Sequence, residues 1–226
     1  MIKIIKNIKD YFKKLRFAKQ QQKKLKVKGS LLHAFSENKK IFIHIPKTAG
    51  ISIVKAIFGD VSLEGHRSIF FYQKVFEKEY TDFFTFTFVR NPWDRLYSSY
   101  KFLEKGGINI HDKNAYEMYL SQFYDFEDFV LNGLDNKLIY KITHFIPQSE
   151  FICNHKGEVL VDFLGKFENL EYDIKKLSEK INKEVVIEHH NKNDKKPYID
   201  VYTNQMKLKV EEIYQRDIDI FKYRFK

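Results

Sequence analysis

The sequence predicts an α/β fold of three layers, in which helices flank a central, mostly parallel sheet. Strand-like and helix-like segments alternate from residue 41 onward, which is typical of parallel sheets connected by helices. Residues 83–89 are all aromatic or β-branched, as expected of a strand buried on both faces. A composition of 43% hydrophobic and 16% aromatic residues indicates a folded globule rather than a disordered chain.

The first strand and helix are predicted at residues 41–45 and about 50–58. Apolar residues surround His44 in the strand, and Pro46 ends it because proline lacks the N–H that sheet pairing needs. Apolar residues at helical spacing then follow. We interpret His44 as a core histidine, since it lies inside an apolar strand.

The next strand, residues 83–89, ends at Asn91 and Pro92. Asn91 is a candidate helix N-cap, and Pro92 suits the first helical position. Gly106 and Gly107 are expected to end this helix. The later elements are predicted as helices at 116–131, from Asn169 to Ile181 and at 204–221, and strands at 159–164 and 185–187.

The first 28 residues account for the whole net charge of +10. They hold eleven Lys or Arg and one acidic residue, whereas the other 198 residues hold 29 basic and 29 acidic ones. Apolar residues from Met1 to Leu15 recur at helical spacing with lysines between them, which predicts a basic amphipathic helix. Two interpretations stay open: residues 1–28 contact an anionic membrane peripherally, or they pack on their own domain. Residues 29–226 are expected to form a single domain.

Cysteine usage and hydropathy favour a cytoplasmic protein. The single cysteine, Cys153, excludes an internal disulfide and fits a buried structural thiol. The apolar runs are too short to span a membrane, and lysines interrupt the N-terminal apolar residues that a signal peptide would need. If residues 1–28 bind lipid, the protein is expected at the inner face of the membrane.

The turn between the first strand and helix, residues 46–52, is typical of an anion site. Unpaired N–H groups and the positive end of the helix dipole favour an anion at a helix start. Lys47 adds a positive charge, and Thr48 and Ser52 add hydroxyl donors. The motif is not a Walker A loop, because the lysine precedes the only glycine. The turn therefore predicts binding of a phosphate or sulfate ester.

A second anion site is predicted around Arg90. This residue follows the strand at 83–89, and ligands of open α/β sheets bind at the carboxyl ends of strands. Ser98 lies two turns into the next helix and is expected to face the same crevice. A guanidinium and a hydroxyl that converge suit a phosphate. The alternative is a structural ion pair between Arg90 and Asp94. Two anion sites indicate a ligand with phosphates at both ends.

Together these segments resemble carbohydrate O-sulfotransferases that use 3′-phosphoadenosine 5′-phosphosulfate (PAPS). The chain resembles the Golgi-type and heparan 2-O-like sulfotransferase family 2, with the features of a bacterial member. Residues 44–52 are similar to the 5′-phosphosulfate loop, and 89–100 to the 3′-phosphate motif. Weaker similarities lie at 144–148, 165–170 and 217–221. The resemblance covers residues 41–224 and implies a P-loop-NTPase-like sandwich within a single sulfotransferase domain, residues 29–226.

The resemblance also implies a role for each residue of the two motifs. The loop residues that would hold the 5′-phosphate are Lys47, Thr48, Ala49, Gly50, Ile51 and Ser52. Lys47 would also neutralise charge on the oxygen that bridges phosphate and sulfate. Arg90 and Ser98 would hold the 3′-phosphate, which distinguishes PAPS from ATP. No metal is expected, and the product would be adenosine 3′,5′-bisphosphate.

The acceptor hydroxyl needs a general base, and the resemblance implies His66. Several family members carry a catalytic histidine at this place, and an imidazole titrates near neutrality. Glu64 is the alternative, because related sulfotransferases use a carboxylate. Arg67 and His144 are expected to contact the acceptor.

Further lysines are expected near PAPS. Lys166 stands where many relatives have arginine, so it keeps the charge but lacks the bidentate fork. Residues 191–198 stand where the family has a basic segment that folds over the cofactor. Lys192, Lys195 or Lys196 would contribute from that segment.

These observations predict an enzyme that transfers a sulfuryl group from PAPS to a carbohydrate hydroxyl by in-line displacement. The acceptor would belong to a glycan, a capsule or a lipid-linked saccharide. Two alternatives are a P-loop-like kinase that uses ATP and Mg²⁺ and a non-catalytic module recruited to the membrane. Nucleic acid is not expected as a partner, because the folded part is neutral and lacks a nucleic-acid-binding motif.

Overall fold

The computed structural model describes residues 2–63, 65–187 and 196–226. In these residues the α-helices are α1 (Ile2–Gln21), α2 (Leu31–Asn38), α3 (Gly50–Phe58), α4 (Ile69–Phe76), α5 (Pro92–Glu104), α6 (Ile110–Tyr119), α7 (Phe126–Asp128), α8 (Ser149–Ile152), α9 (Leu170–Ile181) and α10 (Asn204–Phe221). The strands are β1 (Lys40–Phe42), β2 (Phe84–Val89) and β3 (Phe163–Lys166). A π-helical turn spans Phe129–Gly133, and 3₁₀ turns span Gln22–Lys26, Glu77–Asp82, Leu138–Tyr140, Thr143–Phe145, Phe167–Asn169 and Tyr198–Asp200.

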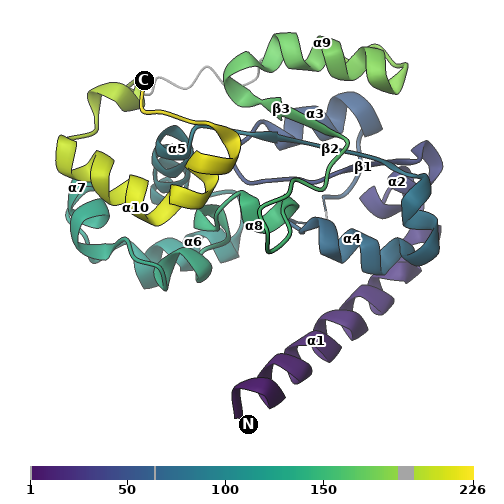
Figure 1. The fold of residues 1–226 in the computed structure, drawn as a ribbon, viewed down its shortest axis with the longest axis horizontal. Coiled ribbons are helices and arrows are strands. Elements are labelled where there is room, and N and C mark those ends of the chain that lie inside the picture. Colours follow the sequence, from purple (N-terminus) through teal and green to yellow (C-terminus); the bar gives the residue numbers. More distant parts are fainter. Residues whose placement is uncertain (1, 64, 188–195) are drawn as a thin grey trace.

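Within the described residues the strands form one parallel sheet in the order β1-β2-β3. The register pairs Ile41 with Thr85 and Phe86 with Phe163, so β2 lies in the centre. Figure 1 shows α3 and α9 above the strands and α4 and α8 below them. The prediction of a parallel sheet flanked by helices is therefore confirmed.

The central strand β2 is aromatic and β-branched because it is buried on both faces. Its two threonines satisfy their hydroxyls inside the fold: Thr87 donates to the carbonyl of Ile43 across 2.6 Å, and Thr85 donates to Asp162 across 2.7 Å. β1 is shorter than the predicted 41–45. Its pairing nevertheless continues by one bond, since the Ile43 N–H donates to the carbonyl of Phe86 across 2.9 Å.

The helix α5 begins as the sequence predicts. Asn91 is the N-cap, its side chain accepts a hydrogen bond from the Trp93 N–H, and Pro92 occupies the first helical turn. This fixes the path of the chain from the end of β2 into the helix that carries Ser98. The predictions of α3 and of the last helix, α10, are also confirmed.

The helix predicted at 116–131 is wrong in its bounds. Asn109 caps α6 earlier, because its side chain accepts hydrogen bonds from the N–H groups of His111 and Asp112. Asp125 then accepts a bond from the Asp128 N–H and starts a separate short helix. Two local caps thus outweigh the apolar spacing from which a single helix was inferred.

Two predicted strands also differ from the structure. The predicted strand at 159–164 begins only at Phe163, because Asp162 bonds to Thr85 through both its backbone and its side chain. The predicted strand at 185–187 is irregular, and the Val185 N–H donates to the Ser178 hydroxyl of α9 across 3.2 Å. Asn169 precedes α9 as expected, but its side chain makes no capping hydrogen bond.

The N-terminal helix α1 packs on the domain at its C-terminal end and projects away from it at the other (Figure 1). Ala18 is fully buried, and the Phe17 ring lies 5.9 Å from the Phe71 ring of α4. The Gln22 amide donates to the carbonyl of Val75 across 2.9 Å. None of the helices in the described part of the chain is long and apolar enough to cross a membrane.

Candidate functional site

The loop before α3 has a backbone that suits an anion. Lys47 and Ala49 both adopt left-handed conformations, with φ of 67° and 65°, and Ala49 is the N-cap of α3 without a side-chain capping bond. Residues other than glycine are strained in the left-handed conformation, and such strain concentrates at functional sites. Alternating backbone conformations of this kind direct successive N–H groups into one concave site. The left-handed backbone of the loop is of this kind, and binding of an anion by it stays a prediction.

The hydroxyls of this loop have different roles. The buried Thr48 hydroxyl donates to the carbonyl of Ile45 across 2.9 Å, so it holds the turn closed instead of facing a ligand. Ser52 is half-buried in the first turn of α3, and Ile51 is 53% exposed. The N–H groups and Ser52 are thus the donors of the loop that are best placed for an anion.

Residue 50 must be a glycine for a steric reason that the sequence did not reveal. A Cβ atom at this position would lie 2.0 Å from Cδ2 and 2.2 Å from Nε2 of His44. The imidazole of His44 therefore lies directly against the start of α3, with only 6% of the residue exposed. His44 is a buried histidine, as expected from its strand, but it borders the anion loop.

Arg90 brings the two predicted anion sites together. Its Nη1 donates to the Lys47 carbonyl across 2.9 Å and to the Ser98 hydroxyl across 3.3 Å, and its Nε donates to Asp94 across 2.7 Å. Arg90 therefore pairs with Asp94, as the structural interpretation expects, and it also converges with Ser98. Binding of a phosphate by the two residues stays a prediction. Nε and Nη1 thus make these contacts within the protein, and the guanidinium charge lies beside the anion loop.

Side chains that the sequence analysis did not single out hold Arg90 in place. The Phe167 ring centroid lies 4.0 Å from the guanidinium carbon, a cation–π contact. The fully buried Gln148 clamps the Arg90 backbone: its Oε1 accepts from the N–H and its Nε2 donates to the carbonyl, both across 2.8 Å. Asp217, also fully buried, accepts from the N–H groups of Gln148 and Ser149. These residues lie in the segments 144–148, 165–170 and 217–221, whose similarity to the family is weak.

Three histidines meet beside the loop. The His66 ring centroid lies 4.4 Å from that of His44 and 5.6 Å from that of His144, and His66 Nδ1 donates to the His44 carbonyl across 2.9 Å. Phe102 of α5 connects this cluster to the anion loop. Its ring lies 5.1 Å from the His144 ring and 4.1 Å from Nζ of Lys47. The structure thus places His144 near Lys47 through the Phe102 ring, and His66 lies against His144.

Burial keeps the three rings neutral. It lowers the pKa of His44 well below the ordinary histidine value, and the neighbouring rings act in the same direction. It also lowers the pKa of His66, although the hydrogen bond to the His44 carbonyl opposes this. The pKa of His144 falls to about 3, above all through burial and further through His66 and the Lys47 ammonium. A neutral imidazole is the form that accepts a proton.

Asp112, which the sequence analysis did not single out, is a carboxylate near the histidine cluster. Its Oδ1 lies 3.9 Å from Nδ1 of His144, and its Oδ2 accepts from the Ile108 N–H and the Asn109 amide. Asp112 therefore ties the loop before α6 to the histidines. Among the residues that the structure describes, no three His, Cys, Asp or Glu side chains are arranged to hold a metal ion.

The side chain of Lys166 contacts the C-terminal segment, and a cofactor contact of this residue stays a prediction. Its ammonium donates to the Phe221 carbonyl across 3.0 Å and lies 4.7 Å from the Tyr223 ring. The ammonium thus satisfies a carbonyl at the C-terminal end of α10, while the Lys166 backbone pairs with Val89, the residue before Arg90. Lys196 is exposed. Glu64, Lys192 and Lys195 lie outside the described residues.

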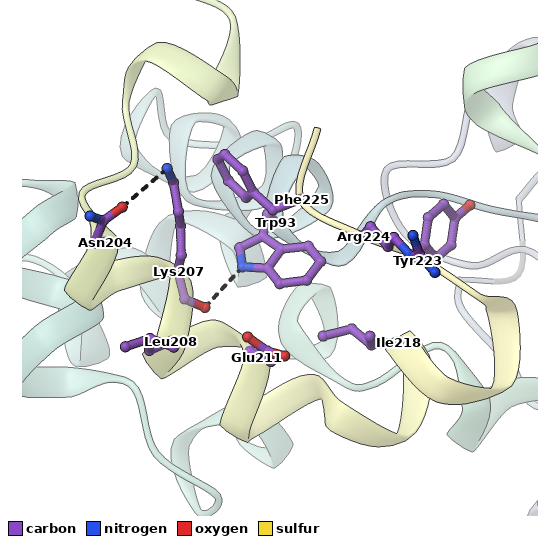
Figure 2. Close-up of a pocket in the computed structure, with 9 residues that line it drawn as sticks. All are labelled: Trp93, Asn204, Lys207, Leu208, Glu211, Ile218, Tyr223, Arg224 and Phe225. Atoms are coloured by element: carbon purple, nitrogen blue, oxygen red, sulfur yellow. Dashed lines mark hydrogen bonds between the residues drawn. The ribbon is translucent and has the colours of Figure 1, made fainter.

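Hollows open on the surface of the described part of the chain. The hollow in Figure 2 has a volume of about 530 Å³ and lies between α10 and the C-terminal segment. Trp93 forms part of its wall, and its indole N–H donates to the Lys207 carbonyl. None of the predicted site residues lines it. The second, of about 900 Å³, reaches His66 and Arg67. The second hollow is therefore the one that meets the histidine cluster.

The comparisons with known proteins agree with this geometry. A family model described as "Sulfotransferase family" matches residues 34–224. An uncharacterised protein of Archaeoglobus fulgidus is 34% identical over 108 residues, which cover 48% of this chain and 75% of that protein. No solved structure matches the chain significantly. Because the family model spans most of the sequence, including the anion loop, Arg90 and the histidine cluster, the chain belongs to the sulfotransferase family.

Proposed function

We propose that this sulfotransferase uses PAPS as the sulfuryl donor and a carbohydrate hydroxyl as the acceptor. The observation that carries the proposal is the position of Arg90, whose guanidinium reaches from the Lys47 carbonyl to the Ser98 hydroxyl. A donor with phosphates at two ends fits two adjacent anion sites of this kind. The backbone of residues 47–52 suits the phosphosulfate end, and Arg90 with Ser98 suits the 3′-phosphate.

The bound donor supplies a sulfuryl group on a phosphate leaving group. Lys47 neutralises charge on the bridging oxygen as the sulfur–oxygen bond breaks, and product adenosine 3′,5′-bisphosphate leaves. Transfer of this type depends mostly on alignment and charge neutralisation. The strained backbone at Lys47 and the Phe102 ring beneath its ammonium support a fixed position for this charge.

His66 is the general base of the proposal. A carbonyl oxygen only accepts hydrogen bonds, so the bond to the His44 carbonyl places the His66 proton on Nδ1 and leaves Nε2 as the acceptor. Nε2 takes the acceptor proton while the acceptor oxygen bonds to sulfur. Burial and the lowered pKa keep this nitrogen unprotonated at neutral pH. Glu64 remains the alternative base.

The decisive experiment is calorimetry with adenosine 3′,5′-bisphosphate and with ADP. We expect the 3′-phosphate to give much tighter binding to the wild-type protein. Arg90→Ala should remove most of this preference, by about 10- to 100-fold, because a charge-assisted pair is lost. Arg224→Ala is the matched control, since Arg224 lines the other hollow. Equal affinity of the wild type for both nucleotides would refute PAPS as the donor and favour a kinase.

A peripheral contact between α1 and an anionic membrane surface is part of the same proposal, which places the protein in the cytoplasm. The basic charge of residues 1–28 supports it. So does Phe12 of α1, which is 54% exposed. Such a position would suit a lipid-linked saccharide as acceptor.

A further inference from the structure

Residues 144–149 connect the histidine cluster with Arg90. At one end of this segment the His144 ring lies 5.6 Å from the His66 ring. At the other end the Gln148 side chain holds both the N–H and the carbonyl of Arg90. One short segment therefore contacts both the predicted base and the predicted 3′-phosphate site.

Arg95 of α5 spans the first part of this segment. Its Nη1 donates to the His144 carbonyl across 3.1 Å, and its Nη2 donates to the Ile146 carbonyl across 2.8 Å. A guanidinium presents its donors in a rigid, planar fork, so the two carbonyls are held at a fixed spacing. These bonds lie inside the protein, since Arg95 is only 1% exposed. The fork therefore sets the path of the chain from His144 to Ile146.

The other groups that hold the segment also come from α5 and α10, which pack against each other (Figure 1). The Ser99 hydroxyl donates to the His144 carbonyl across 3.1 Å, and the Tyr214 hydroxyl donates to the Phe145 carbonyl across 2.7 Å. The buried Asp217 carboxylate accepts from the two backbone N–H groups at the end of the segment, across 2.6 and 2.8 Å. A buried cation thus holds the beginning of the segment and a buried anion holds its end.

The positive charge of Arg95 is buried without an ion pair. Among the described residues, its guanidinium donates to carbonyl oxygens and no carboxylate lies within ion-pair distance, while its buried Nε makes no hydrogen bond. Burial lowers the pKa of Arg95, and Tyr214 and Asp217 offset only part of this effect. An apolar side chain is often more stabilising at such a position. Stability alone therefore does not explain an arginine here, whereas the geometry that it imposes does.

We propose that Arg95 is a positioning residue for both halves of the site. Its fork fixes the His144 ring beside His66 and, through the same segment, fixes Gln148 against the Arg90 backbone. The part that concerns Arg90 rests on the proposed 3′-phosphate site, and the part that concerns His144 does not. Arg95 thus links the alignment of the donor site to the alignment of the predicted base.

The test compares Arg95→Lys with Ser149→Ala. Lysine keeps the positive charge, and with it the long-range attraction for an anion, but it lacks the fork. Ser149→Ala is the matched control in the same segment, because the buried Ser149 hydroxyl makes no hydrogen bond in the described part of the chain. Thermal unfolding shows whether each variant folds. Arg95→Gln, which keeps one amide donor without a buried charge, carries the same test if the lysine variant does not fold.

The first readout is the ratio of the affinities for adenosine 3′,5′-bisphosphate and ADP, measured by calorimetry. We expect Arg95→Lys to lower this ratio about fivefold and Ser149→Ala to leave it within about twofold. In the Gln148→Leu background, Arg95→Lys should lower the ratio no further, because both substitutions act on Arg90 through the same clamp. Additive effects of the two substitutions would overturn a path through Gln148.

The second readout is the ring signal of His144 in the NMR spectrum of the protein labelled with ¹³C-histidine. The signal is assigned by its loss in His144→Gln. The rings of His66 and Phe102, 5.6 and 5.1 Å away, shift it from the position of a free histidine. We expect Arg95→Lys to move the signal toward that position and Ser149→Ala to leave it unchanged.

An unchanged ratio together with an unchanged His144 signal in a folded Arg95 variant would overturn the inference. Equal changes in Ser149→Ala would do the same, because they would reflect a general disturbance of the core. If the wild type prefers the 3′-phosphate and only one readout responds to Arg95→Lys, the link between the two halves is refuted. If the wild type has no such preference, the proposed function fails, and the His144 signal still tests the hold of Arg95 on this ring.

Discussion

His66 donates a hydrogen bond from Nδ1 to the backbone carbonyl of His44 across 2.9 Å. The bond connects the strand segment before the anion loop with the irregular segment before α4. It orients the ring and fixes its tautomer, because a carbonyl oxygen offers no proton. The nitrogen that remains, Nε2, is the only ring atom able to accept a proton from an acceptor hydroxyl. One backbone carbonyl thus prepares the side chain for base catalysis.

We expect His66→Ala to lower kcat by about 100-fold or more, because a general base contributes about 10²–10⁴-fold. The affinity for adenosine 3′,5′-bisphosphate should stay within twofold of the wild type, since the ring contacts neither Arg90 nor Ser98. Labelled sulfate transfer and calorimetry measure the two effects. His33→Ala is the matched control, because His33 Nδ1 makes the same kind of bond to the Leu25 carbonyl across 2.8 Å. Retained turnover in His66→Ala would transfer the role to Glu64.

The free energy of unfolding should fall as the pH drops below about 6.5, the ordinary pKa of histidine. The pKa values of His44, His66 and His144 are lowered in the fold, so the unfolded chain binds more protons in this range. The stabilisation is complete above pH 6.5 and decreases toward the folded-state pKa, about 3 for His144. His144, with its pKa near 3, lowers the folding constant by about tenfold per pH unit below 6.5, and His44 and His66 act in the same direction. Urea unfolding at pH 7.5, 6.5 and 5.5 measures this.

His144→Gln provides the control for the pH dependence. The variant keeps the backbone carbonyl that Arg95 and Ser99 contact, and it removes one titrating ring. Its stability should therefore decrease less steeply between pH 6.5 and 5.5 than that of the wild type. A wild-type stability that does not change over this range would contradict the burial of neutral histidines.

The parts of the fold that the sequence predicts are those set by neighbouring residues. Asn91 and Pro92 act on the backbone within one turn, so the start of α5 is predictable. Asp125 acts in the same way on Asp128, yet the apolar spacing around it hides this cap, and the helix predicted at 116–131 is wrong for that reason. Local caps and apolar periodicity can predict different helix bounds, and the packed structure shows which of the two signals sets them.

The supporting side chains of the site are not predictable in this way. Gln148, Phe167 and Asp217 hold Arg90 or one another from segments far apart in the sequence. A buried Gln or Asp has no spacing pattern, and its partners depend on how the helices pack. The catalytic and binding roles of Lys47, Arg90 and His66 are still predictions, although the structure joins Arg90 to the Lys47 carbonyl.

Gln148 is a positioning residue for Arg90, and we expect Gln148→Leu to reduce ligand discrimination. The variant leaves the Arg90 N–H and carbonyl without their buried partners, which costs about 2–4 kcal/mol of stability. The ratio of affinities for adenosine 3′,5′-bisphosphate and ADP should also fall, because the guanidinium loses its fixed position. Gln22→Leu, which loses one bond to the Val75 carbonyl, should leave the ratio unchanged. A merely structural role would lower both affinities equally.

Small substitutions at two adjacent residues of the anion loop should change the stability of the protein by different amounts. Gly50→Ala places a Cβ atom 2.0 Å from the His44 ring and should destabilise the protein by about 1–3 kcal/mol. Ala49→Gly relieves a left-handed backbone, with φ of 65°, and should change stability by less than about 1 kcal/mol. Urea unfolding of both variants measures the difference. Similar losses in both would show that the His44 contact is not the constraint.

The projecting half of α1 should bind anionic membranes through its basic and aromatic side chains. We expect the full chain to float with vesicles that contain phosphatidylserine and not with phosphatidylcholine alone, because the basic residues of 1–28 supply the attraction. Phe12→Asp should reduce flotation severalfold, since this exposed ring would enter the interface. Leu208→Asp is the control, as Leu208 is 67% exposed on α10. Deletion of residues 1–28 is a poor test, because it also removes the buried Ala18. Flotation that does not depend on anionic lipid would contradict the membrane contact of α1.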